Sequence, residues 1–411
     1  MSGIVILGAG QAGLQLATSL REMGFAGRVR LIGDEPHPPY QRPPLSKAYL
    51  AGTASEAVLF MQEPDFFAQH AIEFLPGEAA VAVDRELKQV QLASGDFVEY
   101  DHLVFATGTR NRHLPCVEGP ISGVLSLRTL ADAQALTAAI AIARNIVVVG
   151  AGFLGLEAAS VACAAGHPVR VIEAGPRALG RVVSEPVSDV VRRCHEVAGV
   201  RFDFSESVIA LHGADGAVTA VELRGGERVP ADLVLVAIGV VPNAELAAAA
   251  GLEVHDGIVV DKDLATGDPA ISAIGDCAAF PYAIDNGRRV RLESVQNAVD
   301  QARCLAARLS GGSGAYDQVP LFWSDQAGLR LQMAGLAQDG DDKVVRGDPA
   351  GTAFSVFRYR GDRLVAVESV NRLPDHMQAR RLLRAGVSPT PEQATNLGFD
   401  LKTLIAMKSA A

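Results

Sequence analysis

The chain is poor in cysteine and in aromatic residues. Five cysteines are scattered along 411 residues, with no C-x-x-C pair and no spacing typical of a zinc site, and aromatic residues make up 5% of the sequence. Scattered cysteines without pairing are typical of a reducing compartment, in which disulfides are rare. We therefore expect a cytoplasmic protein in which the cysteines are small buried residues and bind no metal.

Long apolar runs and an excess of positive charge are missing as well. No stretch approaches about 18 uninterrupted apolar residues, so no transmembrane helix is expected. The N-terminus enters an apolar strand almost at once and lacks a basic segment and a cleavage site, which argues against a secretory signal. The net charge of −10 argues against nucleic acid as a partner. These absences predict a protein that binds neither membrane nor nucleic acid.

The sequence offers no hydrolytic or metal-dependent constellation. Its nine histidines are isolated, and neither a Ser/His/Asp arrangement nor a metal-ligand spacing is evident. We expect no histidine to act as a catalyst and no metal to be bound.

Glycine, by contrast, is abundant and patterned. The motif G-x-G-x-x-G occurs twice, each time after a short apolar strand (Ile4–Leu7 and Ile146–Val149) and before an amphipathic segment (14–23 and 156–165). The glycines are Gly8, Gly10 and Gly13 in the first fingerprint and Gly150, Gly152 and Gly155 in the second. One copy alone is weak evidence, but the context of both copies predicts two dinucleotide-binding units.

Each glycine of a fingerprint has its own physical role. The first permits a tight turn, the second lacks a Cβ that would block a pyrophosphate, and the third lets helix and strand pack closely. The pyrophosphate then binds the N–H groups at the helix N-terminus. Two dinucleotides on one chain suggest a flavin that is reduced by a nicotinamide nucleotide.

An acidic residue closes the second strand of each unit. Asp34 lies 21 residues after Gly13, and Glu173 lies 18 residues after Gly155. Both spacings agree with the roughly 20 residues expected for a carboxylate that binds an adenosine ribose. We assign Asp34, rather than its neighbour Glu35, to the ribose of the first dinucleotide, and Glu173 to that of the second.

The two units also end alike. In each, a β-meander is followed by an apolar strand that runs into Ala-x-Gly, at 106–108 and at 237–239. Strand character resumes at 257–261 and 273–276, which predicts that the second unit is inserted in the first. A helix is expected at Val295–Leu309, and a third region from about residue 320 alternates strands with a terminal helix.

Six motifs carry a family resemblance. They are Arg42-Pro43-Pro44-Leu45-Ser46-Lys47, Ala106-Thr107-Gly108, Ser126-Leu127-Arg128-Thr129, Gly155-Leu156-Glu157, Ile274-Gly275-Asp276-Cys277 and Phe322-Trp323-Ser324-Asp325-Gln326. On these residues the chain resembles, over essentially its whole length, the flavoprotein ferredoxin reductases of bacterial oxygenase systems. These belong to the disulfide-reductase superfamily with two dinucleotide domains.

The resemblance implies an α/β fold with two Rossmann-like dinucleotide-binding domains of the glutathione-reductase type and an α+β C-terminal domain. The implied boundaries are 1–110 and 239–318 for the FAD-binding domain, 111–238 for the NAD-binding domain inserted in it, and 319–411 for the C-terminal interface domain. FAD is expected in the first fingerprint and NADH in the second. Electrons are expected to pass singly to a [2Fe–2S] ferredoxin that supplies a cytochrome P450 or a ring-hydroxylating dioxygenase.

Other branches of this fold remain as alternatives. Disulfide reductases carry a redox-active cysteine pair, but the stretch 42–47 has none, so the electrons must leave the protein. A rubredoxin or quinone reductase is an alternative enzyme, although no membrane-seeking helix supports quinone. A flavin-dependent redox-sensing interaction protein is the other alternative. The lack of a long C-terminal insertion and of a basic DNA-binding surface argues against it.

The resemblance assigns the flavin contacts residue by residue. Lys47 is expected at the flavin N5/O4 edge and paired with Glu157, both as catalytic residues. Asp276 is expected to hold the ribityl hydroxyls. The N-terminus of the helix beginning at Val295 is expected to face the N1–C2=O edge. Trp323 is expected near the isoalloxazine, at the docking surface.

Further cofactor contacts follow from the same resemblance. Arg42 and Arg128 are expected to contact a phosphate or the flavin, for which a fork of donors is suited. Ala12 and Ala80 are expected to contribute backbone contacts only. Gly239, which closes the second Ala-x-Gly phrase, is also assigned to cofactor binding.

The expected nicotinamide nucleotide is NADH. The Glu173 carboxylate can accept hydrogen bonds from both ribose hydroxyls and would repel a 2′-phosphate. Arg177 and Arg181 could reach such a phosphate, but the resembling family has arginines at these places and uses NADH. Arg181 is therefore assigned to the bound nucleotide.

Charge is unevenly distributed along the chain. From Arg303 onward there are 14 Lys and Arg against 11 Asp and Glu, a net charge of +3, whereas the first 302 residues carry 23 against 36, a net charge of −13. A basic C-terminal region could steer an acidic partner, and an ordinary solvated surface is the alternative. We expect ferredoxin to dock around Trp323, with Arg303, Arg330 and Lys402 as basic contributors.

Overall fold

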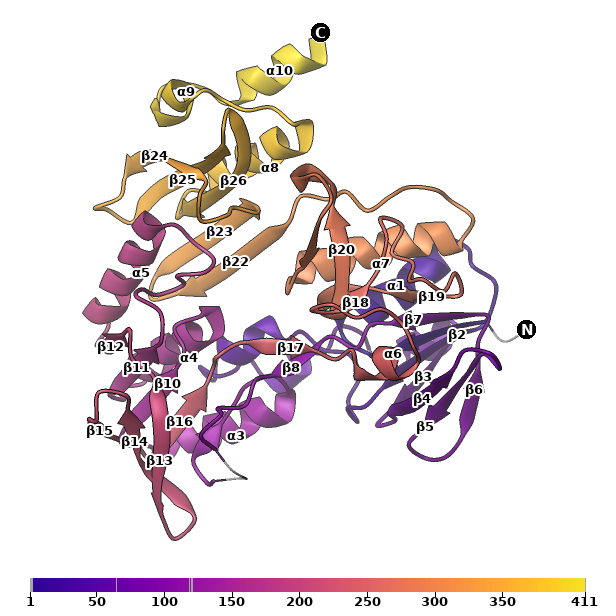
Figure 1. Cartoon of the computed structure of the whole chain (residues 1–411), viewed down its shortest axis with the longest axis horizontal. Helices are drawn as coiled ribbons and strands as arrows, with labels where there is room; N and C mark the ends of the chain where they lie inside the picture. Colours follow the sequence, from indigo (N-terminus) through magenta and orange to yellow (C-terminus); the bar gives the residue numbers. More distant parts are fainter. Residues whose placement is uncertain (1–2, 64, 118, 120, 411) are drawn as a thin grey trace. The chain divides into compact units, whose positions relative to one another are not determined.

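The computed structural model describes residues 3–63, 65–117, 119 and 121–410 (Figure 1). The chain divides into two compact units, each built from three segments of sequence. Unit 1 comprises Met1–Gln41, Glu56–Arg110 and Val240–Pro320, and unit 2 comprises Arg42–Ser55, Asn111–Gly239 and Leu321–Ala411. The chain therefore passes repeatedly from one unit to the other.

A parallel five-stranded sheet forms the centre of unit 1, in the order β19-β7-β1-β2-β3. Its strands are β1 (Ile4–Leu7), β2 (Val29–Gly33), β3 (Ile72–Pro76), β7 (His102–Phe105) and β19 (Ile271–Ala273). All four residues of β1 are buried, as expected for a central strand covered on both faces. Because β19 joins this sheet after the chain has passed through unit 2, the predicted insertion is confirmed.

Helix α1 (Gln11–Glu22) follows β1 and packs against α7 (Val295–Leu309). Its buried face includes Leu14, Ala17 and Leu20, which recur at helical spacing. The helix begins directly after Gly10, earlier than the sequence predicted, because the third glycine of the fingerprint lies inside its first turn. Helix α4 (Phe153–Ala164) begins in the same way after Gly152.

Unit 2 repeats this arrangement with a second parallel sheet in the order β12-β11-β10-β16-β9. The strands are β9 (Val124–Leu125), β10 (Ile146–Val149), β11 (Val169–Glu173), β12 (Val200–Phe204) and β16 (Leu233–Val236). Strand β10 pairs with β11 in the register in which β1 pairs with β2, so each fingerprint lies at the carboxyl end of a central strand. This is the edge of a parallel sheet at which ligands bind.

In each unit a small antiparallel sheet precedes the strand that runs into Ala-x-Gly, β7 in unit 1 and β16 in unit 2, as the sequence predicted. In unit 1 it consists of β4 (Ala80–Asp84), β5 (Gln89–Leu92) and β6 (Phe97–Glu99). In unit 2 it consists of β13 (Val208–Ala214), β14 (Ala217–Leu223) and β15 (Arg228–Pro230).

The C-terminal part of unit 2 is an antiparallel sheet in the order β22-β23-β26-β25-β24, packed against α8 (Leu373–Ala385). Its strands are β22 (Leu321–Gln326), β23 (Leu329–Gly335), β24 (Asp342–Asp348), β25 (Ala353–Arg360) and β26 (Arg363–Val370). A buried ion pair joins Arg358 to Glu368 at 2.8 Å, and Glu368 also accepts the Ser184 hydroxyl at 2.5 Å. These bonds anchor the sheet within unit 2.

The remaining elements complete the two units. Those of unit 1 are η2 (Glu56–Val58), α2 (Phe66–Gln69), β17 (Val240–Pro242), α6 (Glu245–Ala249), β18 (Ile258–Val259), η3 (Gly275–Cys277), β20 (Ala278–Tyr282), η4 (Ala283–Asp285) and β21 (Arg288–Arg291). Those of unit 2 are η1 (Pro43–Ser46), α3 (Leu130–Ile142), α5 (Glu185–Val197), α9 (Pro391–Thr395) and α10 (Lys402–Ala410), and β8 (Thr109–Asn111) lies at a point where the chain passes between the units. None of the helices formed by the described residues has the length and apolar character that crossing a bilayer requires.

Candidate functional site

The first fingerprint loop has the shape that a pyrophosphate requires. Gly8 has a φ of +111°, and a Cβ on it would overlap the carbonyl oxygen of Ala106. A Cβ on Gly13 would overlap the carbonyl oxygen of Gly8, whereas a Cβ on Gly10 would project into open space. No described side chain caps the N-terminus of α1 at Gly10, so the backbone donors of its first turn are available to an anion. The loop therefore fits the diphosphate of a dinucleotide.

The second fingerprint loop repeats this geometry. Gly150 has a φ of +105°, and a Cβ on it would overlap the carbonyl oxygen of Ala237. A Cβ on Gly155 would overlap the Gly150 carbonyl, and a Cβ on Gly152 would meet nothing within 4 Å. In both units, the alanine whose carbonyl packs on the first glycine is the alanine of the Ala-x-Gly motif. This packing explains why the Ala-x-Gly motif occurs in both units.

The two acids that follow the second strands differ in their surroundings. Asp34 is exposed, directly after β2. Its neighbour Glu35 accepts a hydrogen bond from the Tyr40 hydroxyl at 2.5 Å. Glu173 ends β11, and its two carboxylate oxygens accept the backbone N–H groups of Ala151 and Gly175, each at 2.7 Å. The side chain of Glu173 is thus already oriented toward the second fingerprint loop.

The two arginines near the second fingerprint, Arg177 and Arg181, differ in their hydrogen bonds and exposure. The Arg177 guanidinium donates to the carbonyls of Gly180 and Val183, each at 2.7 Å, so it holds its own loop together. Arg181 is exposed. A Cβ on Gly239 would lie 3.9 Å from the guanidinium of Arg181. Of the two, Arg181 is therefore the better placed for a ligand at this loop.

In unit 1, the turn η3 places Asp276 beside the start of α1. Gly275 has a φ of +76°, and a Cβ on it would lie 3.0 Å from the Cβ of Ala12. The N–H of Gly275 donates to Oε1 of the buried Gln301 at 2.7 Å. The turn that carries Asp276 is thus held between α1 and α7.

Helix α7 begins at Val295, as predicted. The Ser294 side chain caps it by accepting the N–H of Asn297 at 3.4 Å. Ala80, the remaining predicted contact of unit 1, is half-buried at the start of β4.

In unit 2, Lys47 and Glu157 form an ion pair. Lys47 Nζ lies 2.7 Å from Glu157 Oε2, and the glutamate is buried in the first part of α4 with 6% of its side chain exposed. The hydroxyl of Ser46 donates to the same oxygen at 2.5 Å, and the hydroxyl of Ser324 donates to Oε1 at 2.5 Å. The pairing implied by the resemblance is therefore present, with two further donors that the sequence analysis missed.

Arg42 and Arg128 lie next to each other in the same unit. The Arg42 guanidinium donates to the carbonyl of Arg128 at 2.5 Å. A capping box between Thr129 and Asp132 begins α3, and the Asp132 carboxylate also accepts the N–H of Arg128 at 2.9 Å. The T-x-x-D spacing was a readable signal for this helix start, which the sequence analysis passed over.

Comparison with known proteins identifies the family. A model described as pyridine nucleotide-disulphide oxidoreductase matches residues 2–302, and one described as reductase C-terminal matches residues 321–405. The chain belongs to the pyridine nucleotide-disulphide oxidoreductase family. Rhodocoxin reductase of Rhodococcus erythropolis is 49% identical to it over 403 residues, which cover 98% of this chain and 94% of the relative.

Two crystal structures are similar over the whole chain. The ferredoxin reductase for the CYP199A2 system from Rhodopseudomonas palustris is 46% identical, with a TM-score of 0.95 and 100% of both chains covered. The reductase in the covalent putidaredoxin reductase–putidaredoxin complex is 40% identical, with a TM-score of 0.96, and the match covers 100% of this chain and 99% of that one. These likenesses confirm the resemblance to ferredoxin reductases of oxygenase systems and the α/β fold. The chain is an oxidoreductase of the FAD- and nicotinamide-dependent kind.

This member of the pyridine nucleotide-disulphide oxidoreductase family has no thiol prepared for disulphide chemistry. All five cysteines are free, and burial raises the pKa of each of their thiols. Cys277 alone is buried; the other four are half-buried, so the expectation of five buried cysteines was wrong for them.

The residues predicted for docking are distributed over both units. Trp323, on β22, is 44% exposed, and Arg330 on the neighbouring strand forms an ion pair with Asp325 at 3.2 Å. Lys402 is exposed at the start of α10 in unit 2, and Arg303 is exposed on α7 in unit 1. The Asp325 partner reduces the charge that Arg330 offers to another protein.

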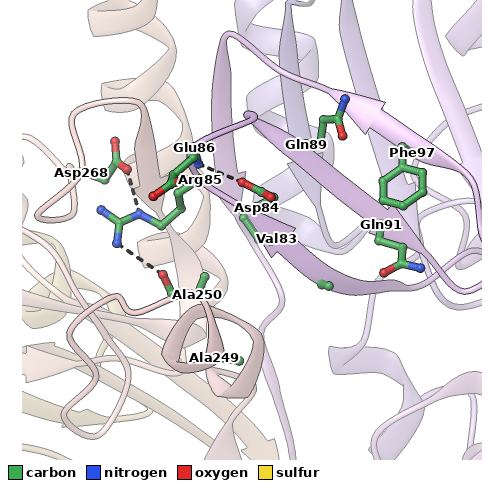
Figure 2. A pocket seen from close by; sticks show the side chains of 11 residues that line it. Val83, Asp84, Arg85, Glu86, Gln89, Gln91, Phe97, Ala249, Ala250 and Asp268 are labelled. Atoms are coloured by element: carbon green, nitrogen blue, oxygen red, sulfur yellow. Dashed lines mark hydrogen bonds and ion pairs between the residues drawn. The ribbon is translucent and has the colours of Figure 1, made fainter.

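Unit 1 also contains a hollow of about 790 Å³ to which neither fingerprint contributes (Figure 2). It lies along the small sheet β4-β5-β6 beside α6. The Arg85 guanidinium on its wall pairs with Asp268 at 2.9 Å and donates to the carbonyl of Ala250 at 3.3 Å (Figure 2). Because these polar groups satisfy one another, the hollow offers no cation prepared for a ligand.

Proposed function

We propose that this protein is an NADH-dependent ferredoxin reductase that delivers single electrons to a [2Fe–2S] ferredoxin of an oxygenase system, either a cytochrome P450 or a ring-hydroxylating dioxygenase. The observation that carries the proposal is the combination of two open fingerprint loops with a chain that has no C-x-x-C pair and no cysteine in the stretch 42–47. Two dinucleotides can bind, but no internal dithiol can take the electrons. The likeness to a reductase crystallised with putidaredoxin supports an iron–sulfur protein as the acceptor.

Several residues would hold the flavin in unit 1. The backbone donors at the N-terminus of α1, beside Gly10, would bind the pyrophosphate. Asp34 would bind the adenosine ribose, and Asp276 would bind the ribityl hydroxyls. Bound FAD supplies the capacity to accept an electron pair and to release electrons one at a time. The roles toward FAD that the resemblance implies for Arg42, Lys47, Arg128 and Trp323 are part of the same proposal.

NADH would bind at the second loop. Glu173 would accept hydrogen bonds from the ribose hydroxyls, and the orientation that Ala151 and Gly175 give its carboxylate supports this. Because the Arg177 guanidinium is held by two carbonyls of its own loop, it would offer little to a 2′-phosphate. Arg181 would contact the bound nucleotide. NADH is therefore the proposed nucleotide rather than NADPH.

We also propose a cytoplasmic location, because five unpaired cysteines are typical of a reducing compartment. The electron donor NADH is available there.

The FAD-loaded protein tests the proposal in one assay. Bleaching of the flavin absorbance would be followed after mixing with NADH or NADPH. Cytochrome c reduction would then be measured with and without a [2Fe–2S] ferredoxin from a bacterial oxygenase system, with rubredoxin and a soluble quinone as alternative acceptors. We expect reduction by NADH and a strong dependence of cytochrome c reduction on the ferredoxin. Preference for rubredoxin or quinone would overturn the proposed acceptor.

A further inference from the structure

A line of buried hydrogen bonds leads away from the Lys47–Glu157 pair inside unit 2. Oε1 of Glu157 accepts a hydrogen bond from the Ser324 hydroxyl at 2.5 Å, and Ser324 Oγ accepts one from Nε2 of Gln326 at 2.8 Å. The amide oxygen of Gln326 lies 2.9 Å from Nε2 of His195. Ser324 and His195 are fully buried, and Gln326 is 5% exposed. This line of hydrogen bonds therefore connects α5 to α4 through β22, and the side chains that form it are buried from solvent.

The chemistry of the groups fixes the direction of each bond. An amide oxygen only accepts, so Nε2 of His195 carries the proton. Burial lowers the pKa of His195, while its hydrogen bond to Gln326 opposes this more weakly, so the ring is neutral near pH 7. The Ser324 hydroxyl has one proton, and because its oxygen accepts from Gln326, that proton is directed at Glu157. All bonds run from the histidine to the carboxylate, and in such a chain each bond polarises the next.

The second oxygen of Glu157 is held from another element. Oε2 accepts the Ser46 hydroxyl at 2.5 Å and the Lys47 ammonium at 2.7 Å. A buried carboxylate is costly unless donors surround it. Ser46 and Lys47, from η1 and its end, donate to one carboxylate oxygen. Among the described residues, Ser324 is the donor to the other oxygen. The carboxylate cannot rotate without breaking a bond to one of these elements.

Ser324 is also the neighbour of the exposed tryptophan. Successive residues of a strand point to opposite faces, and accordingly Trp323 is 44% exposed while Ser324 is fully buried. Strand β22 thus places the Trp323 side chain at the surface and the Ser324 hydroxyl next to Glu157.

We propose that Ser324 is a positioning residue, which orients the Glu157 carboxylate and through it the Lys47 ammonium, while Gln326 and His195 hold the Ser324 hydroxyl in place. This inference rests on the proposed function, in which Lys47 and Glu157 serve nicotinamide-dependent reduction. It adds three side chains to the site. Their effect is on the geometry of the pair.

The test compares Ser324→Ala, Ser324→Thr and the matched control Ser369→Ala in the FAD-loaded protein. Ser369 is a buried serine of the same sheet whose hydroxyl is hydrogen-bonded to that of Ser355 at 3.1 Å instead. The limiting rate constant for flavin reduction and the Kd for NADH would be measured by stopped flow. We expect Ser324→Ala to lower the rate constant roughly tenfold, the effect of one hydrogen bond to a charged group. The Kd should stay unchanged, Ser324→Thr should recover most of the rate, and Ser369→Ala should have no effect.

A double-mutant cycle between Ser324→Ala and Glu157→Gln gives a second readout that needs no turnover. Urea unfolding would be measured for both single variants and for the double variant. If Ser324 acts through Glu157, the double variant loses no more stability than the worse single variant, and its reduction rate is no lower. Additive losses in both measurements, or an unchanged rate in Ser324→Ala, would overturn the proposal.

Gln326→Met tests the same line if Ser324→Ala does not fold. This variant keeps Ser324 and removes the donor that directs its proton, so we expect a rate constant several-fold lower, and an unchanged rate would count against the proposal. Failure of the parent protein to be reduced by NADH would refute the proposed function instead. The unfolding cycle would still report whether Ser324 acts on Glu157.

Discussion

The carboxylate of Glu173 accepts the backbone N–H of Ala151 at 2.7 Å, so the acid at the end of β11 is bonded to the middle of the second fingerprint loop. Its other oxygen accepts the N–H of Gly175. One side chain therefore shapes the loop, and under the proposed assignment it also presents negative charge where a ribose or a 2′-phosphate would lie. Removing the charge of Glu173 should mainly change the preference between NADH and NADPH. Removing the whole side chain should also lower kcat/KM for NADH.

Replacing Glu173 should change nucleotide preference. Glu173→Gln keeps an acceptor for the loop but loses the charge, so kcat/KM for NADPH should rise relative to that for NADH. Glu173→Ala also loses the bonds to the loop and to the ribose, and kcat/KM for NADH should fall about 5- to 150-fold. Steady-state ferricyanide reduction measures both, with the exposed Glu196→Ala of α5 as control. Equal use of NADH and NADPH by the parent protein would contradict the assignment.

Alanine substitutions at different fingerprint glycines should affect either dinucleotide binding or the stability of the fold. Because a Cβ on Gly10 meets nothing, Gly10→Ala should leave the stability of the apoprotein nearly unchanged and abolish FAD retention. In Gly13→Ala the new Cβ overlaps the Gly8 carbonyl, so the fold itself should lose several kcal/mol, on the order of 3. Gly152→Ala is the matched control, since it should keep FAD and lose affinity for NADH. Urea unfolding and FAD content after gel filtration distinguish the three variants. Retention of FAD by Gly10→Ala would show that the pyrophosphate lies elsewhere.

Asp276 should matter for FAD and not for NADH. Asp276→Ala removes the acid that the η3 turn holds beside α1, so FAD should be lost more readily on dialysis against potassium bromide. Affinity for NADH should remain, because the proposed nucleotide residue Glu173 belongs to the other unit. Asp263→Ala, at a half-buried site of the same unit, serves as control. Full FAD occupancy of Asp276→Ala after dialysis would refute the role.

Arg303, on α7, should affect how readily ferredoxin associates with the protein. Arg303→Ala should raise the KM for ferredoxin and flatten its dependence on salt, since steering between charges is screened over about 8–10 Å at ordinary ionic strength. NADH-to-ferricyanide turnover should not change, because it bypasses docking. Arg330 is a poorer test because Asp325 already pairs with it. A salt dependence identical to that of the parent would place docking on another surface.

Acid should destabilise the fold through His102. Burial, with the nearby charge of Arg308, lowers the pKa of His102 to about 4, whereas the unfolded chain binds this proton near pH 6.5. Stability from this group is therefore complete above pH 6.5 and is lost as the pH falls toward 4. Between pH 7 and pH 5 the loss should be about 2 kcal/mol. His102→Gln should remove that part of the pH dependence in urea unfolding, and an unaltered slope would refute it.

Much of the fold could be predicted because its signals are local. A fingerprint, the strand before it and the acid after it lie within a few tens of residues, and their geometry follows from which glycines cannot carry a Cβ. The Lys47–Glu157 pair came from the family resemblance, and the ion pair is present at 2.7 Å. The domain boundaries and the roles of the assigned residues stay predictions.

The rest of the site depends on contacts distant in sequence. Ser324 meets Glu157 across 167 residues, and Gln326 meets His195 across 131, so neither contact leaves a pattern in the chain. The register of β22 decides that Ser324 rather than Trp323 points inward. The hydrogen bonds from Arg177 to carbonyls of its own loop likewise depend on the folded shape of that loop, so the sequence alone does not predict them.

The central claim is most directly tested by measuring NADH-driven cytochrome c reduction at increasing concentrations of a [2Fe–2S] ferredoxin, with the FAD-loaded protein and no other reductase. The account predicts a rate that is near zero without ferredoxin, rises to saturation as ferredoxin is added, and is much lower with NADPH. Equal rates with and without ferredoxin, or electron delivery that requires a thiol or disulfide acceptor, would contradict it.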